Sequence, residues 1–181
     1  MRRASPTPAP EASRRAEPPR PAPPAIPEPE REREASQAGR ERAARRLATA
    51  YLDYWSAPNA VTLDATPDFY ASRVEFHGRE MSARALFEEK RRFVRRWPVR
   101  DYVPRRNSTD TTCSAASETC TVRTAFDYTA SNPETGRRAQ GVANLELVIS
   151  FAGGAPVIVG ETSRVLRSGR PAPAPLEEDE D

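Results

Sequence analysis

Three successive segments between Cys120 and Leu166 alternate apolar and polar residues with a period of two. The residues that share one face of each segment are Val122, Thr124, Phe126 and Tyr128, then Ala143, Leu145, Leu147, Ile149 and Phe151, then Val157, Val159, Glu161, Ser163 and Val165. This period is typical of β-strands that bury one face. Turn-forming residues separate the segments, at 131–136 and at Gly153-Gly154. The run therefore predicts a meander of long antiparallel strands, and we expect its last strand to be interior because both of its faces carry apolar residues.

Helical periodicity precedes these strands. Apolar residues recur at helical spacing between Glu34 and Trp55, a shorter helix is expected from Thr62 onward, and a third helix follows Ser82 as its N-cap and ends near Arg96. Residues 73–81, between the second and third helices, predict a hairpin whose turn is His77-Gly78. Helices followed by a meander of strands predict a domain of the α+β class.

The two ends of the chain differ in composition from its middle. Residues 1–35 hold ten of the 19 prolines, mixed with Arg and Glu, and residues 168–181 end in an acidic run. Such segments bury too little apolar area to offset the entropy of ordering them. We therefore expect a disordered arm over 1–35, one folded domain over 36–167 and a disordered acidic tail over 168–181.

Charge and hydropathy exclude two classes of function. The net charge of +2 falls far short of a nucleic-acid-binding surface, although the arginines between 91 and 106 form a dense basic cluster. Most of that cluster is expected to be a solvated helix face paired with Glu88 and Glu89, with binding to an anionic polymer as the alternative. Nothing in the sequence predicts a membrane span or a secretory signal, so the chain as written is expected to be soluble.

The two cysteines, Cys113 and Cys120, flank an expected hairpin tip, where the strands would bring the thiols opposite one another. A disulfide is the favoured interpretation, and free thiols are the alternative. If the bond forms, an oxidising compartment such as the periplasm is indicated, and otherwise the cytoplasm. A zinc site would need more Cys or His ligands than the sequence offers, so no metal or cofactor is predicted.

Several motifs resemble one group of proteobacterial modules with no assigned activity. They are Tyr70 with Arg73-Val74-Glu75-Phe76, a Lys-containing helix that ends in Arg96-Trp97-Pro98, the two cysteines, and the final Glu161-Thr162-Ser163-Arg164-Val165. The group belongs to the NTF2-like superfamily, which includes nuclear transport factor 2 and SnoaL-type proteins, and the resemblance covers about 45–166. It implies a cone in which a curved antiparallel sheet wraps around about three helices and leaves a pocket at one end. Some modules of the group accompany caspase-like peptidases, but no caspase motif follows His77 here.

Three residues, Glu161, Tyr51 and His77, are candidates for chemistry in such a pocket, with Tyr54 as an alternative to Tyr51. Glu161 lies among valines, where burial would raise its pKa, and His77 is the only imidazole of the chain. In ketosteroid isomerases, which share this fold, an Asp base works beside a Tyr and a protonated Asp. Here Tyr51 or Tyr54 could be the phenol and Glu161 the acid. Alternatively, Glu161 pairs with Lys90 or an arginine, and His77 is an exposed turn residue.

The expected pocket residues are Tyr51, Tyr54, Trp55, Tyr70, Phe126, Tyr128 and Glu161. The favoured function is a non-enzymatic accessory module for protein interaction or binding of a small apolar ligand, with a homodimer through the sheet left open. The alternative is an enzyme of the SnoaL or ketosteroid isomerase kind that performs acid–base chemistry on an apolar cyclic substrate. An enzyme needs at least two polar groups converging in a deep pocket, whereas an interaction module can have its cone filled by aromatic side chains.

Overall fold

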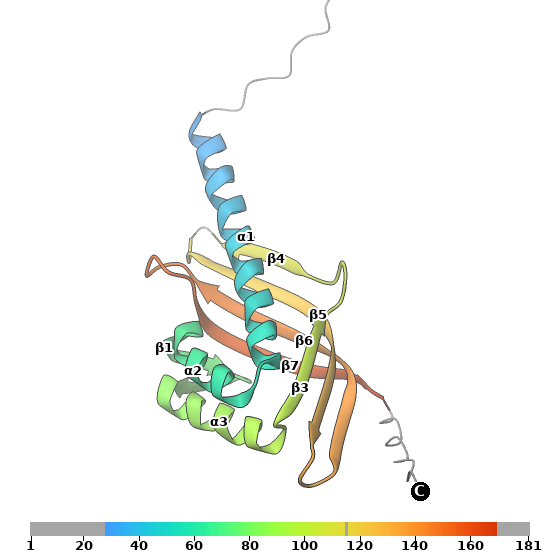
Figure 1. Cartoon of the computed structure of the whole chain (residues 1–181). Helices are drawn as coiled ribbons and strands as arrows, with labels where there is room; N and C mark the ends of the chain where they lie inside the picture. Colours follow the sequence, from blue (N-terminus) through green and yellow to red (C-terminus); the bar gives the residue numbers. More distant parts are fainter. Residues whose placement is uncertain (1–27, 115, 170–181) are drawn as a thin grey trace, which may run out of the picture.

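A curved sheet of seven strands packs three helices against one of its faces (Figure 1). The computed structural model describes residues 28–114 and 116–169. The elements are α1 (Glu28–Ser56), α2 (Asn59–Phe69), β1 (Tyr70–Phe76), β2 (Arg79–Ser82), α3 (Ala83–Arg96), β3 (Val99–Pro104), β4 (Asp110–Ser114), β5 (Thr119–Asn132), β6 (Arg137–Ser150) and β7 (Val157–Ser168). The architecture is the α+β cone expected from the sequence.

The strand order is β2-β1-β7-β6-β5-β3, and β4 pairs with the same edge of β5 as β3 does, farther along the strand. All neighbours are antiparallel except β1 and β7, which are parallel through Glu75↔Gly160 and Phe76↔Glu161. The expectation of a wholly antiparallel sheet was therefore wrong at this one pair. Side-chain alternation is the same in both kinds of pairing, and no turn connects these two strands, so the sequence pattern could not reveal their relative direction.

Helix α1 begins at Glu28, inside the 1–35 segment expected to be disordered, and Figure 1 shows its first turns projecting beyond the sheet. Residues 28–35 are mostly Glu, Arg and Ala, which favour helix, and Pro29 falls in the first turn, where a missing N–H costs nothing. At the other end, β7 continues to Ser168, one residue past the expected boundary. The rest of the arm and tail, 1–27 and 170–181, lies outside the described residues.

The long strands present their predicted faces to the helices. Leu145, Leu147 and Ile149 of β6 are almost fully buried, opposite Val122 and Cys120 of β5. Strand β7 departs from the prediction, because its register with β6 shifts between Gly160↔Val148 and Ile158↔Ile149. This bulge at Val159 puts Ile158, rather than Val157 and Val159, on the buried face together with Glu161. A bulge adds one residue without changing the composition of the strand, so it is invisible to a period of two.

The expected hairpin and third helix are present. His77 and Gly78 both have positive φ, as a two-residue turn between β1 and β2 requires. The Ser82 hydroxyl accepts a hydrogen bond from the Ala85 N–H and caps α3. Within α3, Leu86, Lys90 and Val94 form the buried face, while Arg91 and Arg92 pair with Glu88 and Glu89 on the exposed side.

Arg100 was expected to be solvated with the other arginines between 91 and 106, but it is buried. It lies on β3, and its guanidinium donates to the carbonyl oxygens of Trp55 at 3.0 Å and Ala57 at 3.1 Å, near the end of α1. It also donates to Asn59 Oδ1 at 2.7 Å and to the Trp97 carbonyl after α3. Carbonyl groups at helix C-termini lack partners within the helix and carry partial negative charge, so one arginine satisfies both helix ends.

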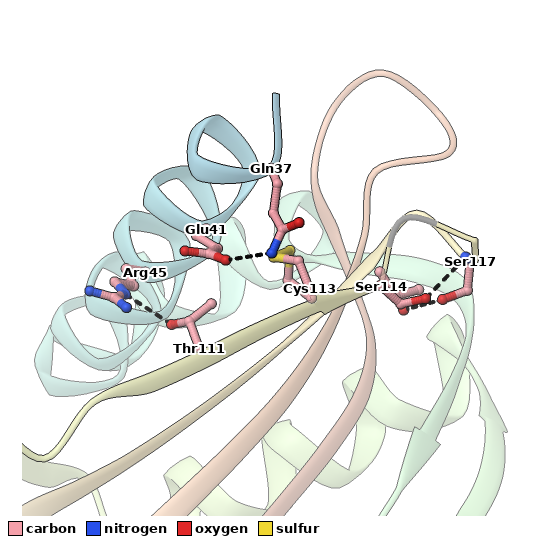
Figure 2. Close-up of a disulfide and its surroundings, with 9 residues drawn as sticks. Gln37, Glu41, Arg45, Thr111, Cys113, Ser114 and Ser117 are labelled. Carbon is pink, nitrogen blue, oxygen red and sulfur yellow. Dashed lines mark hydrogen bonds between the residues drawn. A yellow bond between two sulfur atoms is a disulfide. The ribbon is translucent and has the colours of Figure 1, made fainter. Parts of the chain in front are cut away.

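The predicted disulfide joins Cys113 of β4 to Cys120 of β5, which oppose one another in the register. Figure 2 shows Cys113 on β4, the strand that packs against α1, and the hydrogen bond that Gln37 Nε2 of α1 donates to Glu41 Oε1 one helical turn away. On the same side, Arg45 Nε donates to Thr111 Oγ1 at 3.0 Å. The disulfide therefore links β4 to β5 in the part of the sheet against which α1 packs.

Candidate functional site

A cavity of about 600 Å³ lies between α1, α3 and the sheet. Most of its wall is aromatic or aliphatic, from Tyr51, Leu52, Trp55, Phe76, Phe93, Trp97, Tyr102, Phe126, Tyr128, Ala130, Ala139, Ala143, Leu145 and Val165. The exposed lining residues, among them His77, Arg79 and Ser163, mark its mouth. The cone is thus hollow rather than filled by its aromatic side chains.

Lys90 and Glu161 form a buried ion pair in the wall of this cavity. Lys90 comes from the inner face of α3, and Glu161 comes from β7 just after the bulge; each is only 6% exposed. The Lys90 Nζ atom lies 2.7 Å from Glu161 Oε1 and 2.9 Å from Oε2. Of the two sequence interpretations of Glu161, the pairing with Lys90 is the one that this geometry favours.

Two tyrosines complete the polar cluster. Lys90 Nζ donates to the Tyr51 hydroxyl at 2.9 Å, and the Tyr70 hydroxyl donates to Glu161 Oε2. The hydroxyl oxygens of Tyr51 and Tyr70 lie 3.0 Å apart. A hydroxyl has only one hydrogen, and Tyr70 gives its hydrogen to the carboxylate. The hydrogen of Tyr51, which lines the cavity, is therefore the one that can turn from Tyr70 toward a ligand.

Aromatic rings surround the ammonium of Lys90. Its Nζ atom lies 4.5 Å from the centroid of Trp55 and 4.7 Å from that of Phe76, with Tyr51 and Tyr70 at 5.5 and 5.6 Å. Each ring is within reach of a cation–π interaction. The cluster therefore offsets the burial of a positive charge with a carboxylate, a hydroxyl and four aromatic rings.

Burial shifts the protonation equilibria of Lys90, Tyr51 and Tyr70 toward their neutral forms. It lowers the pKa of the Lys90 ammonium, against the opposing effect of the Glu161 charge. It raises the pKa of the Tyr51 and Tyr70 hydroxyls well above 10, and the nearby Glu161 charge raises both further. The raised pKa values favour the protonated, hydrogen-bond-donating form of both tyrosines.

The structure places the seven expected pocket residues in three groups. Tyr51, Trp55, Phe126, Tyr128 and Glu161 line the cavity. Tyr70 lies behind the wall, where it reaches Glu161 and also lines a separate hollow of about 220 Å³ between α2 and α3. Tyr54 points away, 40% exposed, with its ring packed on Phe69 at 5.2 Å.

His77, the third candidate for chemistry, lies at the mouth of the cavity and is exposed. Its main-chain N–H donates to the Glu161 carbonyl at 2.9 Å, which joins the hairpin turn to β7. Lys90 was predicted only as a partner for Glu161, although it lies four residues from both Leu86 and Val94 on the apolar face of α3. That spacing was the available signal that its side chain enters the core.

Within the described ranges 28–114 and 116–169, no group of three or more His, Cys, Asp or Glu residues is placed to hold a metal ion. No helix among the same residues is both long and apolar enough to cross a membrane.

Several solved structures share this architecture. An aromatic ring hydroxylase, provisionally so named, from Novosphingobium aromaticivorans superposes with a TM-score of 0.61 at 12% identity, over 72% of this chain and 91% of its own. A provisionally named dehydratase of the NTF2-like family from Streptomyces avermitilis gives 0.56 at 8% identity, over 75% and 99%. An NTF2-like protein with a cystatin-like fold, also from N. aromaticivorans, gives 0.51 at 13% identity, over 76% and 87%.

The chain therefore has the NTF2-like fold, also described as cystatin-like. At these identities the likeness establishes the fold and not the activity. Comparison with models of protein families and with curated protein sequences finds no match. The resemblance to the proteobacterial group accordingly remains a prediction.

Proposed function

We propose that this domain is a non-enzymatic module that binds one small, largely apolar molecule inside the cone. The observation that carries the proposal is the cavity itself. Its volume of about 600 Å³ falls within the range of ligand pockets, about 300–1,000 Å³. Its wall combines many aromatic side chains with a single polar cluster, the combination by which such pockets supply both affinity and orientation.

The polar cluster supports binding over acid–base catalysis. Both Glu161 oxygens already accept hydrogen bonds, Oε1 from Lys90 and Oε2 from Lys90 and Tyr70. A general base must reach the proton that it abstracts with a free lone pair in suitable geometry, and the ion pair holds this carboxylate toward Lys90. The exposed His77 lies at the mouth rather than among the groups that converge deeper in the cavity.

One observation favours the enzymatic alternative. Tyr51 and Lys90 place two hydrogen-bond donors side by side in the wall, 2.9 Å apart. Two such donors could stabilise negative charge that develops on a ligand oxygen. The alternative would be supported by turnover of a cyclic ketone that is lost in Tyr51→Phe.

The cavity offers its own reporter of ligand binding, because both tryptophans of the sequence, Trp55 and Trp97, line it. We expect 1-nitronaphthalene, an apolar quencher, to reduce their fluorescence saturably. Ser163→Phe should weaken the binding about tenfold or more, a loss of about 1.4 kcal/mol, because the new ring enters the mouth.

The matched control is Thr162→Phe, one residue away on the same strand, also exposed and absent from the cavity wall. It should leave the dissociation constant unchanged. Quenching that does not saturate, or that both variants weaken equally, would contradict ligand binding in the cavity.

A further inference from the structure

Lys90 is the only lysine among the 28 lysine and arginine residues of the sequence. Among residues 28–114 and 116–169 it is also the one basic side chain that contacts the polar cluster of the cavity, where its ammonium group lies against Glu161 and Tyr51. An arginine guanidinium stays protonated in proteins, whereas a lysine can lose its proton and become a nucleophile. The one titratable aliphatic amine among the side chains thus lies inside the ligand cavity.

The groups around Lys90 match those that amine chemistry requires. Glu161 can take the proton that frees the nitrogen lone pair, since its oxygens lie 2.7 and 2.9 Å from Nζ. Tyr51, whose hydroxyl lies 2.9 Å from Nζ, lines the cavity beside it and can donate a hydrogen bond to a ligand oxygen. A nucleophile, a base and a proton donor are therefore in mutual contact at one point of the wall.

We propose that Lys90 captures a small apolar aldehyde or ketone as a reversible Schiff base. This inference rests on the proposed function, because the carbonyl compound must first occupy the cavity. It goes further by naming the ligand class and the atom to which the ligand becomes bonded.

The step balances without a co-reactant. The ammonium gives one proton to the Glu161 carboxylate, and the free amine attacks the carbonyl carbon to form a C–N bond. The carbinolamine oxygen, hydrogen-bonded to Tyr51, receives protons that originate from the nitrogen and leaves as water. Glu161 ends as a carboxylate and Lys90 as a positively charged iminium, so the net change is carbonyl plus ammonium to iminium plus water.

The cavity suits both ends of this reaction. Burial lowers the pKa of Lys90 and so favours the nucleophilic amine. The iminium keeps the positive charge, and therefore keeps the attraction to Glu161 and to the rings of Trp55 and Phe76 that already surround Nζ at 4.5 and 4.7 Å. The same contacts serve the free lysine and its product.

A purely structural ion pair makes the opposite prediction, namely that Lys90 is protected from reagents. A reactive Lys90 and a protected Lys90 can be distinguished in the Arg137→Lys variant, which is otherwise unchanged. This substitution adds one exposed lysine on the β5–β6 hairpin as an internal reference. We would incubate this variant with 2-naphthaldehyde and sodium cyanoborohydride at neutral pH, and locate the secondary amines by peptide mass spectrometry. The amino group at the N-terminus is a second internal reference.

The expected result is modification of Lys90 at least about tenfold faster than of the lysine at position 137, because the cavity concentrates and orients the aldehyde. Excess 1-nitronaphthalene should suppress modification of Lys90 only. Modification confined to position 137 and the N-terminus, or modification of Lys90 that the competitor leaves unchanged, would overturn the proposal. If 1-nitronaphthalene still quenches the tryptophans in that case, ligand binding stands and only the Schiff base fails; if it does not, both fail.

Discussion

The ion pair between Lys90 and Glu161 gives a sharp test of how the domain tolerates charge in its core. Both side chains are 6% exposed, so removing one partner leaves the other charge buried without its counter-ion. The usual cost of that change is about 3–5 kcal/mol. We expect Lys90→Met to fall in this range, because Glu161 would keep only the hydrogen bond from Tyr70.

Neutralising the other partner, in Glu161→Gln, should reduce the free energy of unfolding by less than Lys90→Met does. The ammonium keeps its contacts with Trp55 and Phe76, and a desolvated cation–π interaction contributes about 2 kcal/mol. The double variant leaves two neutral side chains, with the amide oxygen of the glutamine still able to accept from Tyr70. It should recover to within about 1–2 kcal/mol of the original protein, since neutralising a buried pair as a whole is far less costly than breaking it.

Urea unfolding at neutral pH, followed by the fluorescence of Trp55 and Trp97, measures all four free energies of unfolding. The two single changes must not be additive, because their side chains are in direct contact. A double variant that loses the sum of the two single losses would refute the account of Lys90 and Glu161 as a mutually stabilising pair.

Three further outcomes follow from the structure. Arg100→Lys should destabilise the domain by about 3 kcal/mol in urea unfolding, because it leaves buried carbonyls at two helix ends unpaired, whereas exposed Arg91→Lys should change stability by less than about 0.5 kcal/mol. Burial raises the pKa of Tyr51 and Tyr70 well above 10 and that of Tyr102 to about 12, so these three stay protonated in the folded state when they would ionise in the unfolded state. Stability should therefore fall above pH 10, by up to about 1.4 kcal/mol per pH unit for each of them. A titration of the phenolate absorbance checks this. Unreduced protein denatured in urea should show no free thiol, and reduction should cost about 2–3 kcal/mol; two free thiols would remove the reason to place the domain in an oxidising compartment.

The sign of the alkaline effect depends on which state binds more protons. A folded-state pKa above the unfolded value means that the unfolded chain loses its phenolic protons first, so rising pH favours unfolding. Lys90 acts in the opposite direction, because its pKa is lowered by burial and the unfolded chain holds that proton longer. Stability therefore rises with pH through Lys90 as pH approaches 10.5, and the three tyrosines reverse that trend above pH 10.

The elements that the sequence predicts well are those whose signal is local. The alternation through Leu145, Leu147 and Ile149 marks the buried face of β6, and the turn at His77-Gly78 marks the β1–β2 hairpin, because each depends only on neighbouring residues. The direction of β1 against β7 depends instead on residues more than 80 positions apart. The bulge at Val159 is set by how β7 fits β6, so alternation alone assigns the wrong face to Val157.

The candidate site shows the same division. Aromatic side chains such as Tyr51 and Trp55 could be assigned to the pocket from helical spacing, whereas Tyr54, one position away, turns to Phe69. Arg100 is the clearest failure of local reasoning. It looks like one more residue of an exposed basic cluster, and only the meeting of the two helix ends around it shows why a cation is buried there.

Ligand binding, the function proposed above, would account for the cluster around Lys90 better than stability does. A buried ion pair contributes little compared with apolar residues of the same size, which would fill the space without desolvating two charges. The aromatic and aliphatic side chains that already surround Lys90 and Glu161 show that the site could accommodate such residues. The chain uses arginine at every other lysine or arginine position. Its one lysine lies beside a carboxylate in the wall of a hollow, largely apolar cone, where a bound ligand would meet the pair.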